Sequence, residues 1–465
     1  MSLPTTNLSR PHRFYIAKRY FKGHSGAQLH LCETENEFRV MTEENQREKR
    51  YTLRGDAVLE LWQKGMEAWN SWMEQFPNTT VIFDFVDFSN YRKKNQKLSF
   101  EGYHFGDASF LLSCFGDGGV DFSGARFHGD VDFSKAYFGD GNVDFYEARF
   151  CGHVNFCKAC FANGDVDFSK THFTGKFLNF EAARFDNGHL DFTNAIFENC
   201  NVVFIEANLT KLTFHPKSFG LGSISAQALS VERHTLFIIP FSDDSSITLT
   251  MYGASFGGAL FVSGNFGIVP DLRATRCYHQ VDLSGLKVKL PRTFGWPPKL
   301  SRVAEDPEDG ARLRRLKEIA ETNKDHQAAL RFSADENRAK RWIETSWFGS
   351  VLDMAFSFFS DYGQSILRPV LWLLAIFVDG TSIYLALATG TLANWRAGLE
   401  QAALLSASNS LPFLPQSRDL REDALTALYG TDPSLCIDIL MIAQGVLSFI
   451  FLFLIGLGLR NRFRL

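Results

Sequence analysis

The chain has 465 residues, a formal net charge of −4 and 46 phenylalanines. This length allows more than one domain, whereas the charge is too small to indicate an acidic or a basic partner by itself. The sequence has no phosphate-binding glycine loop, and no nucleophile, base and orienting group recur at catalytic spacing, so we expect neither an enzyme nor a cofactor site.

Residues 1–80 are predicted to be an N-terminal segment that ends in a capping helix. The segment lacks an apolar run long enough for a signal peptide, so we expect the front of the chain to stay in the cytosol. Apolar residues recur at helical spacing from Val58 to Phe76, after Asp56 as a candidate N-cap. This helix is expected to cover the open end of the domain that follows, because an uncapped solenoid exposes unpaired strand edges.

Residues 81–300 carry a phenylalanine repeat. Each unit reads aliphatic residue, Asp or Asn, Phe, two variable residues, Ala, one variable residue, Phe. Its first Phe recurs every 11 or 12 residues from Phe122 to Phe204, and its second Phe follows five residues later. This period fits neither a helix nor a lone strand, so it predicts a chain that turns corners and stacks its coils about 4.8 Å apart. The second Phe of a unit and the small residue shortly before it should both point inward, the small residues being Ala125, Ala136, Ala148, Ala159, Ala182, Ala195 and Ala207.

The strict step of five from Phe100 to Phe115 resembles the pentapeptide-repeat proteins. After Phe115 the sequence departs from that family by inserting one or two residues between pairs. The resemblance implies a mainly β fold, a right-handed quadrilateral β-helix. The order of parts, with repeats, charged helices, "DYGQSILRP" and the tail "GLGLRNRFRL", is similar to a membrane-anchored bacterial branch with a C-terminal two-helix transmembrane hairpin.

Cysteines within the repeat were considered as metal ligands. Cys157 and Cys160 form a C-x-x-C pair beside His153, which is one half of a common zinc pattern. However, they occupy the variable positions that Ser123 and Arg126 fill in another unit. We therefore expect no metal site there.

Residues 301–345 are predicted to be a charged helical linker. They are rich in helix-forming and charged residues, and a break near Asn323 to Asp325 favours a solvated helical hairpin. Residues 346–365 then concentrate apolar side chains between Trp347 and Phe359. We expect them to form an interfacial helix that lies on a bilayer.

Residues 366–465 are predicted to form a transmembrane hairpin. The segment from Leu435 to Leu459 has one acid near its start and is long enough to cross the bilayer. The segment from Ile366 to Ala388 is less uniform but is also predicted to cross. Because Arg368 and the C-terminal arginines should stay in the cytosol, we expect a multi-pass protein of the inner membrane with both termini cytosolic.

Asp379 interrupts the first predicted span halfway along its length. A carboxylate near the middle of a bilayer costs a few kcal/mol, so such residues usually face a partner helix or a water-filled cavity. The alternative is that the span breaks at Asp379 and Gly380 and that the acid reaches the interface. The sequence favours neither interpretation.

The connection between the spans, residues 392–415, contains a short apolar helix from Trp395 to Leu405 and a polar turn from Ser406 to Ser410. This layout is that of two-span channel subunits, whose loop re-enters the membrane, although the potassium-filter motif is absent. The alternative is an extracytoplasmic helix that rests on the membrane. The candidate pore or intramembrane polar residues are Asp379, Ser408, Asn409, Ser410 and Gln444.

Three functions are compatible with these features. The first is a cytosolic recognition solenoid, with an unknown protein partner, coupled to a hairpin that forms an oligomeric pore; two spans cannot enclose a pore alone, so a homo-oligomer is required. The second is a membrane-tethered protein-binding scaffold without conductance. The third, a topoisomerase-binding imitation of duplex DNA, needs a strongly acidic surface. Outward Arg and Lys residues argue against the third function, and no nucleic acid is expected.

Overall fold

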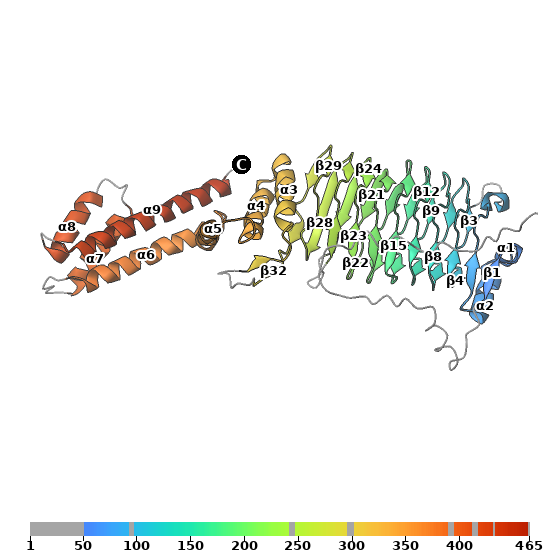
Figure 1. Cartoon of the computed structure of the whole chain (residues 1–465), viewed down its shortest axis with the longest axis horizontal. Helices are drawn as coiled ribbons and strands as arrows, with labels where there is room; N and C mark the ends of the chain where they lie inside the picture. The colour runs from blue at the N-terminus through green and yellow to red at the C-terminus, as the bar shows by residue number, and fades with distance from the viewer. Residues whose placement is uncertain are drawn as a thin grey trace, which may run out of the picture. The chain divides into compact units, whose positions relative to one another are not determined.

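The structure is a computed structural model that describes residues 51–92, 97–240, 247–294, 302–388, 395–411, 417–430 and 433–463. A parallel β-solenoid comes first in the chain and helices follow it (Figure 1). Residues 1–50 lie outside the described part. The expectation that the front of the chain stays in the cytosol therefore concerns residues that the structure does not describe.

The solenoid has four sides, and each side is one parallel sheet. The first sheet has nine strands, in the order β1 (Thr52–Arg54), β2 (Thr80–Ile82), β5 (Ala108–Ser109), β8 (Val131–Asp132), β11 (Val154–Asn155), β15 (Phe177–Asn179), β19 (Asn201–Val203), β23 (Ser223–Ser225) and β26 (Thr248–Thr250). The second sheet has ten strands. Nine of them lie in the order β3 (Leu98–Ser99), β6 (Val120–Asp121), β9 (Val143–Asp144), β13 (Val166–Asp167), β17 (His189–Asp191), β21 (Lys211–Phe214), β25 (Thr235–Ile238), β28 (Leu260–Phe266) and β30 (Val281–Asp282). The tenth strand, β31 (Leu286–Val288), also pairs with β28.

The other two sides have six strands each. One runs β22 (Ser218–Phe219), β18 (Ile196–Phe197), β14 (His172–Phe173), β10 (Arg149–Phe150), β7 (Arg126–Phe127) and β4 (His104–Phe105). The other runs β12 (Cys160–Phe161), β16 (Arg184–Phe185), β20 (Asn208–Leu209), β24 (Ser230–Val231), β27 (Ser255–Phe256) and β29 (Arg276–Cys277). An antiparallel pair, β32 (Arg292–Thr293) and β33 (Val303–Ala304), follows the last coil. The predicted four-sided coil is therefore confirmed.

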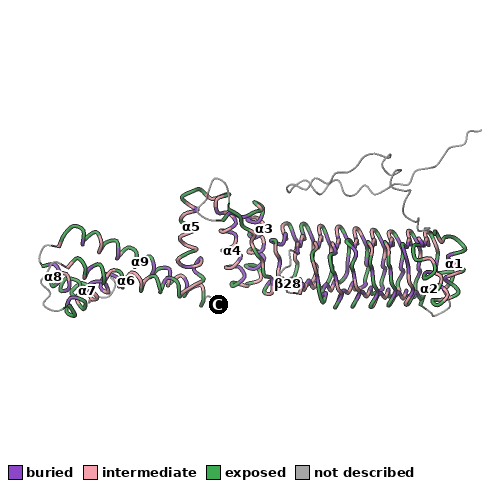
Figure 2. The backbone as a smooth tube through the Cα atoms, turned by 90° about the horizontal axis from the view of Figure 1, so that it is seen from below, coloured by how far each residue is buried: buried purple, intermediate pink, exposed green. Residues whose placement is uncertain are grey.

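Stacked phenylalanines fill the solenoid. Parallel pairing in register places Phe127 over Phe105 and Phe150 over Phe127, with ring centroids 4.8 Å apart in both pairs. Buried positions alternate with exposed ones around each coil (Figure 2). One inward alanine differs from the prediction: Ala183 is buried, whereas Ala182 has a φ of 53° and lies at the turn. The inserted residues therefore lengthen the turns between the sides and leave the stacked phenylalanines in register.

Two short helices cover the first coil, where the pattern predicted one. They are α1 (Asp56–Gln63) and α2 (Met66–Gln75), and the N-cap residue of α1 is Gly55 rather than Asp56. Trp62 stacks on Phe100 with a centroid distance of 5.4 Å. The indole Nε1 of Trp69 donates a hydrogen bond of 2.7 Å to the carbonyl of His104. The apolar face of the cap thus closes the Phe core at this end.

The predicted linker is a second cap. Its two helices, α3 (Asp309–Thr322) and α4 (His326–Lys340), are separated at the predicted break, and the Asp325 side chain accepts a hydrogen bond of 3.0 Å from the Ala328 amide. The expectation of a solvated linker is wrong, because Leu316 and Phe332 are buried in the same hydrophobic core as the solenoid. The abundant charges lie around a narrow apolar stripe, which is why composition suggested exposure.

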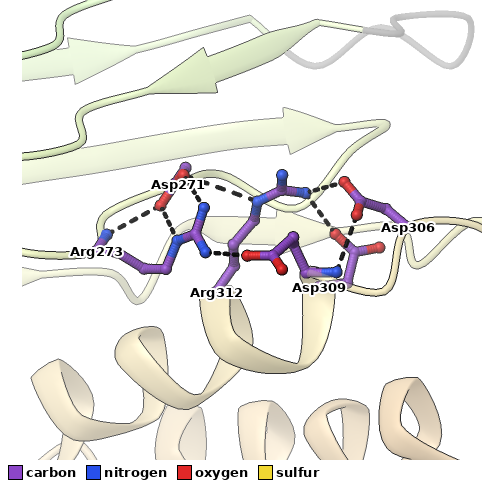
Figure 3. Close-up of polar contacts among 6 residues, drawn as sticks. Asp271, Arg273, Asp306, Asp309 and Arg312 are labelled. Atoms are coloured by element: carbon purple, nitrogen blue, oxygen red, sulfur yellow. Dashed lines mark hydrogen bonds and ion pairs between the residues drawn. The ribbon is translucent and has the colours of Figure 1, made fainter. Parts of the chain in front are cut away.

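An ion-pair network joins this second cap to the last coils (Figure 3). Arg312 in α3 donates to Asp306 at 2.6 Å and to Asp309 at 2.9 Å. Its Nε lies 3.9 Å from a carboxylate oxygen of Asp271 in the solenoid, which is also bound by Arg273 at 2.8 Å. The Asp309 side chain is 1% exposed, and this burial raises the pKa of the carboxyl group to about 6.

Five helices follow: α5 (Trp347–Ser360), α6 (Leu367–Ala386), α7 (Trp395–Ser410), α8 (Ser417–Tyr429) and α9 (Leu435–Phe463). Among the described residues, α6 and α9 are long and apolar enough to cross a membrane. The predicted polar turn is wrong, because residues 406–410 continue helix α7. Parts of the predicted re-entrant loop, residues 392–394 and 412–415, lie outside the described residues.

Candidate functional site in the apolar hairpin

A buried polar cluster lies where α6, α7 and α9 meet. We define it as Tyr384 of α6, Ser406, Asn409 and Ser410 of α7, and Gln444 of α9. Each of these side chains belongs to a buried residue. Since α6 and α9 are predominantly apolar, polar groups buried between them must find their hydrogen-bond partners within the protein.

Gln444 is the centre of this cluster. Its Oε1 accepts a hydrogen bond of 2.7 Å from the Tyr384 hydroxyl, and its Nε2 donates to Ser406 Oγ at 2.7 Å. The same Nε2 also lies 3.3 Å from Ser410 Oγ, while Asn409 Nδ2 donates to the Tyr384 hydroxyl at 3.2 Å. Every member is therefore hydrogen-bonded, which is the condition under which a buried polar network makes packing rigid and specific.

Gly380 allows the three helices to come this close. A Cβ atom at this position would lie 2.7 Å from Ser406 Oγ and 2.8 Å from Gln444 Nε2. Small residues at helix interfaces are a common means of close approach in membranes, where apolar burial drives association only weakly. From the sequence, a break of the span at Asp379 and Gly380 is one of two open alternatives; in the structure α6 is continuous through Gly380.

Helix α8 closes the outer end of the bundle and is absent from the sequence prediction. Its Tyr429 hydroxyl donates a hydrogen bond of 2.6 Å to the carbonyl of Tyr384. Leu428 and Ala424 share a hydrophobic cluster with Leu405 of α7. The connection between the spans is therefore a packed helical pair over much of its length.

The five predicted polar residues fall into three places. Asn409, Ser410 and Gln444 meet in the polar cluster. Ser408 is buried, but its Oγ donates to the carbonyl of Leu405 in its own helix at 2.8 Å. Asp379 is exposed on the outside of the hairpin. The structure therefore does not bring Asp379 to the Asn409 region, as the pore hypothesis had assumed.

Tyr384 and Ser406 are cluster members that sequence analysis missed. The i, i+4 spacing of Ser406 and Ser410 could have indicated one helical face, but the serine-rich run favoured a turn. Tyr384 lies near the end of an apolar span, where tyrosine is common at the membrane interface and so attracts no special notice. Its role depends on a hydrogen bond to a residue 60 positions away.

Asp379 belongs to a polar strip on the outer face of α6. Ser382, one turn further on, is also exposed, and its hydroxyl donates to the Val378 carbonyl at 2.9 Å. The neighbouring exposed side chains Leu374, Val378 and Ile383 are apolar. Within the described part of the chain, no ion pair reaches Asp379. A carboxylate in this position of a membrane-spanning helix requires water or a partner outside the hairpin.

The start of α6 and the end of α9 lie together. Asn461 Nδ2 donates a hydrogen bond of 3.2 Å to the carbonyl of Gly363, and a Cβ at Gly458 would lie 3.0 Å from Ile366 Cγ1. Arg368 at one helix start and Arg460 at the other helix end therefore share one end of the hairpin.

A set of partly buried ion pairs connects α4 to the hairpin. We call it the joint and define it as Arg338, Arg341, Asp353, Asp361 and Tyr362. Arg341 Nε donates to Asp353 at 2.7 Å, and Arg341 Nη2 donates to the Tyr362 hydroxyl at 2.8 Å. Tyr362 in turn donates to Asp353 at 2.9 Å, and Arg338 Nη2 donates to Asp361 at 2.6 Å. Burial raises the pKa of Tyr362 to about 12, so it acts here as a neutral donor.

The turn that carries the joint has an unusual backbone. Asp361, Tyr362 and Gly363 have φ values of 50°, 57° and 75°, so three successive residues lie in the left-handed region. For residues other than glycine this conformation is disfavoured and persists where surrounding contacts over-determine it. The ion pairs of Arg338 and Arg341 supply such contacts, so turn and joint depend on each other.

Comparisons of this chain with protein-family models, with curated proteins and with solved structures found no match. The functional argument therefore rests on the geometry described above.

Proposed function

We propose that the chain is a membrane-anchored pentapeptide-repeat protein whose cytosolic solenoid recognises a protein partner and whose hairpin assembles into a channel-like oligomer. The observation that carries this proposal is the exposed carboxylate of Asp379 on the outward side of the apolar helix α6. Several copies arranged around an axis would place the Asp379 and Ser382 strips against one another or around water, which removes the cost of exposing a charge to lipid.

Membership of the pentapeptide-repeat proteins is supported by the side chains at each face of the coil. One Phe or Leu lies at the centre of most sides, and the residue before it is polar and points outward, as at Asp121, Asp144 and Asp167. Exposed Arg126, Arg149 and Arg184 interleave with the acids, which supports a protein partner over imitation of DNA.

An inner-membrane location with both termini cytosolic is supported by the shared hairpin end. Arg368 and Arg460 lie at that end, together with the joint and the solenoid cap. Positively charged residues close to span ends favour the cytosolic side. Placing the solenoid in the cytosol also suits its cysteines, since the six described ones in the solenoid are free thiols.

The joint provides a route by which binding at the solenoid could reach the hairpin. Its ion pairs connect α4, which closes the solenoid core, to the turn that starts α6. Because the buried polar cluster is closed by its own hydrogen bonds, it is proposed to hold each hairpin rigid rather than to line a path. The path is assigned instead to the Asp379 face between protomers.

The test is electrical recording of the purified full chain in planar bilayers, together with its mass in detergent. We expect an oligomer with measurable conductance, and Asp379→Asn should change conductance or ion preference while the hairpin stays folded. The matched control is Asp438→Asn, an exposed carboxylate in the first turn of α9. No conductance under any potential, with no effect of Asp379→Asn on oligomer mass, would contradict the proposal.

A membrane-tethered scaffold without conductance is the second candidate, and the closed polar cluster is the observation that favours it. In that case Asp379 would serve only contacts between helices. Asp379→Asn would then alter the oligomer mass while recordings of both proteins stay silent.

A further inference from the structure

The β32–β33 pair lies between the last coil and the second cap. Arg292 is paired with Ala304 across the two strands, and Val303 and Ala304 are buried. Helix α4 packs against β33. Since α4 also carries Arg338 and Arg341 of the joint, this pair of strands is attached to the same helix that connects to the membrane hairpin.

The exposed side of this pair is basic and aromatic. Arg292 and Arg302 are both exposed, and Phe294 is 74% exposed. The Arg302 guanidinium lies over the Phe294 ring, 5.2 Å from its centroid. An arginine that stacks on an exposed aromatic ring keeps its five donors available for another ligand.

The charge around Arg292 is not balanced by carboxylates. Partial desolvation lowers the pKa of Arg292, and the like charges of Arg338 and Arg341 lower it further. Asp335 opposes this effect but is already bound by Arg338 at 2.7 Å. Within the described residues, no ion pair joins Arg292 or Arg302 to an acid, whereas Arg341 and Arg338 are held by Asp353 and Asp361.

Helix α5 has one side that faces the protein and one that faces outward. Its polar residues Ser350 and Asp353 face the protein, as their hydrogen bonds with the Trp342 amide and Arg341 show, and Ser360 is buried. Its opposite side exposes large apolar residues, namely Trp347, Phe348, Leu352 and Phe358. An apolar face turned outward beside two membrane-spanning helices fits the headgroup boundary of a bilayer.

We propose that Arg292 and Arg302 bind the phosphate groups of anionic phospholipids in the leaflet contacted by α5, with Phe294 at the headgroup level. Guanidinium groups bind phosphate through paired hydrogen bonds, and each basic residue near an anionic leaflet adds to membrane affinity. A lipid is preferred over a soluble phosphate because an exposed aromatic ring lies with the cations. In addition, α4 contacts both β33 and α5, the helix that exposes an apolar face. This surface would fix the solenoid cap on the membrane, and it does not depend on whether the hairpin conducts.

The test uses the purified full chain in neutral detergent with dioctanoyl phosphatidylglycerol or dioctanoyl phosphatidylcholine, and native mass spectrometry measures the lipid retained. We expect a preference for phosphatidylglycerol that falls roughly tenfold in Arg292→Gln/Arg302→Gln. The control Arg126→Gln/Arg149→Gln removes two exposed arginines from β7 and β10 and should keep the preference. Circular dichroism should show all three proteins folded.

Two further arms separate other sources of binding. If Arg460→Gln/Arg462→Gln removes the preference and Arg292→Gln/Arg302→Gln does not, the end of α9 holds the lipid and the proposal is overturned. Glycerol 3-phosphate should fail to displace phosphatidylglycerol at equal concentration. Full displacement would assign the site to free phosphate esters and overturn the membrane contact.

Discussion

Asp309 is the residue at which burial and charge oppose each other most clearly. Its carboxyl pKa is raised to about 6 by burial, although Arg312 donates to it at 2.9 Å. The native state therefore binds this proton more tightly than the unfolded chain does. The stabilisation from protonation is fully present below the ordinary aspartate pKa and is lost as the pH rises through about 6.

This linkage predicts that wild-type stability falls between about pH 4 and pH 7 relative to Asp309→Asn, by about 2 kcal/mol. The asparagine keeps an oxygen that can accept from Arg312 but carries no charge. Thermal unfolding of both proteins over this pH range measures the difference. Asp186→Asn, an exposed carboxylate on the solenoid, is the control for removal of a charge without burial. Parallel pH profiles for wild type and Asp309→Asn would show that the ion pairs fully offset the burial.

At the residue scale, the inward positions were predictable because the same position in every coil must hold an apolar side chain that packs on the coils above and below. A Phe stacked on a Phe must recur with the coil, so the period alone places Phe122, Phe145 and Phe168 in the core. The error at Ala182 has the same origin. Two adjacent alanines leave the register ambiguous, and the left-handed turn residue is fixed only by the neighbouring coils.

At the scale of elements, the helices of the hairpin depend on one close approach. Gly380→Ala should destabilise the hairpin by roughly 1 to 3 kcal/mol, because the new Cβ would meet Ser406 and Gln444 at less than 3 Å. Gly445→Ala in α9 is the matched control, since a Cβ there meets nothing within 4 Å. Thermal unfolding in detergent should separate the two variants. Equal stability would mean that the polar cluster relaxes around the added methyl group.

Two elements were mispredicted for a shared physical reason. The charged residues between 309 and 340 suggested a solvent-exposed helical hairpin. The serines between 406 and 410 suggested a turn. In the folded chain, α3 and α4 bury a narrow apolar stripe against the solenoid. The polar side chains Asn409 and Ser406 of α7 form hydrogen bonds with Tyr384 and Gln444. Local sequence records neither partner, because both come from distant segments.

At the scale of the whole molecule, the predicted order of parts is supported by the structure, while the interior of the hairpin was not predictable. Three of five candidate residues meet in the polar cluster, yet Asp379 faces outward. A helical wheel for α6 cannot by itself show which side contacts α7. That side is determined by Gly380 and Tyr384, whose partners lie on other helices.

The topology of the hairpin gives the last prediction. Since the start of α6 and the end of α9 share one end, and arginines lie there, that end should be cytosolic and α8 should lie on the far side. Cysteine-free variants with a single Asp419→Cys in α8 or Phe463→Cys at the end of α9 replace exposed residues. A membrane-impermeant maleimide applied from outside should label Asp419→Cys, and it should label Phe463→Cys only after the membrane is permeabilised.

The opposite labelling pattern would place the solenoid outside the cytosol, and labelling of both positions without permeabilisation would contradict a spanning hairpin.

The expected labelling pattern would also fix the side of the membrane on which the joint lies. The joint of Arg338, Arg341, Asp353, Asp361 and Tyr362 would then lie at the cytosolic surface, next to the α6 end of the hairpin. A partner bound to the solenoid could act on the Asp379 face through that joint, because its ion pairs connect the cap to the turn that precedes α6.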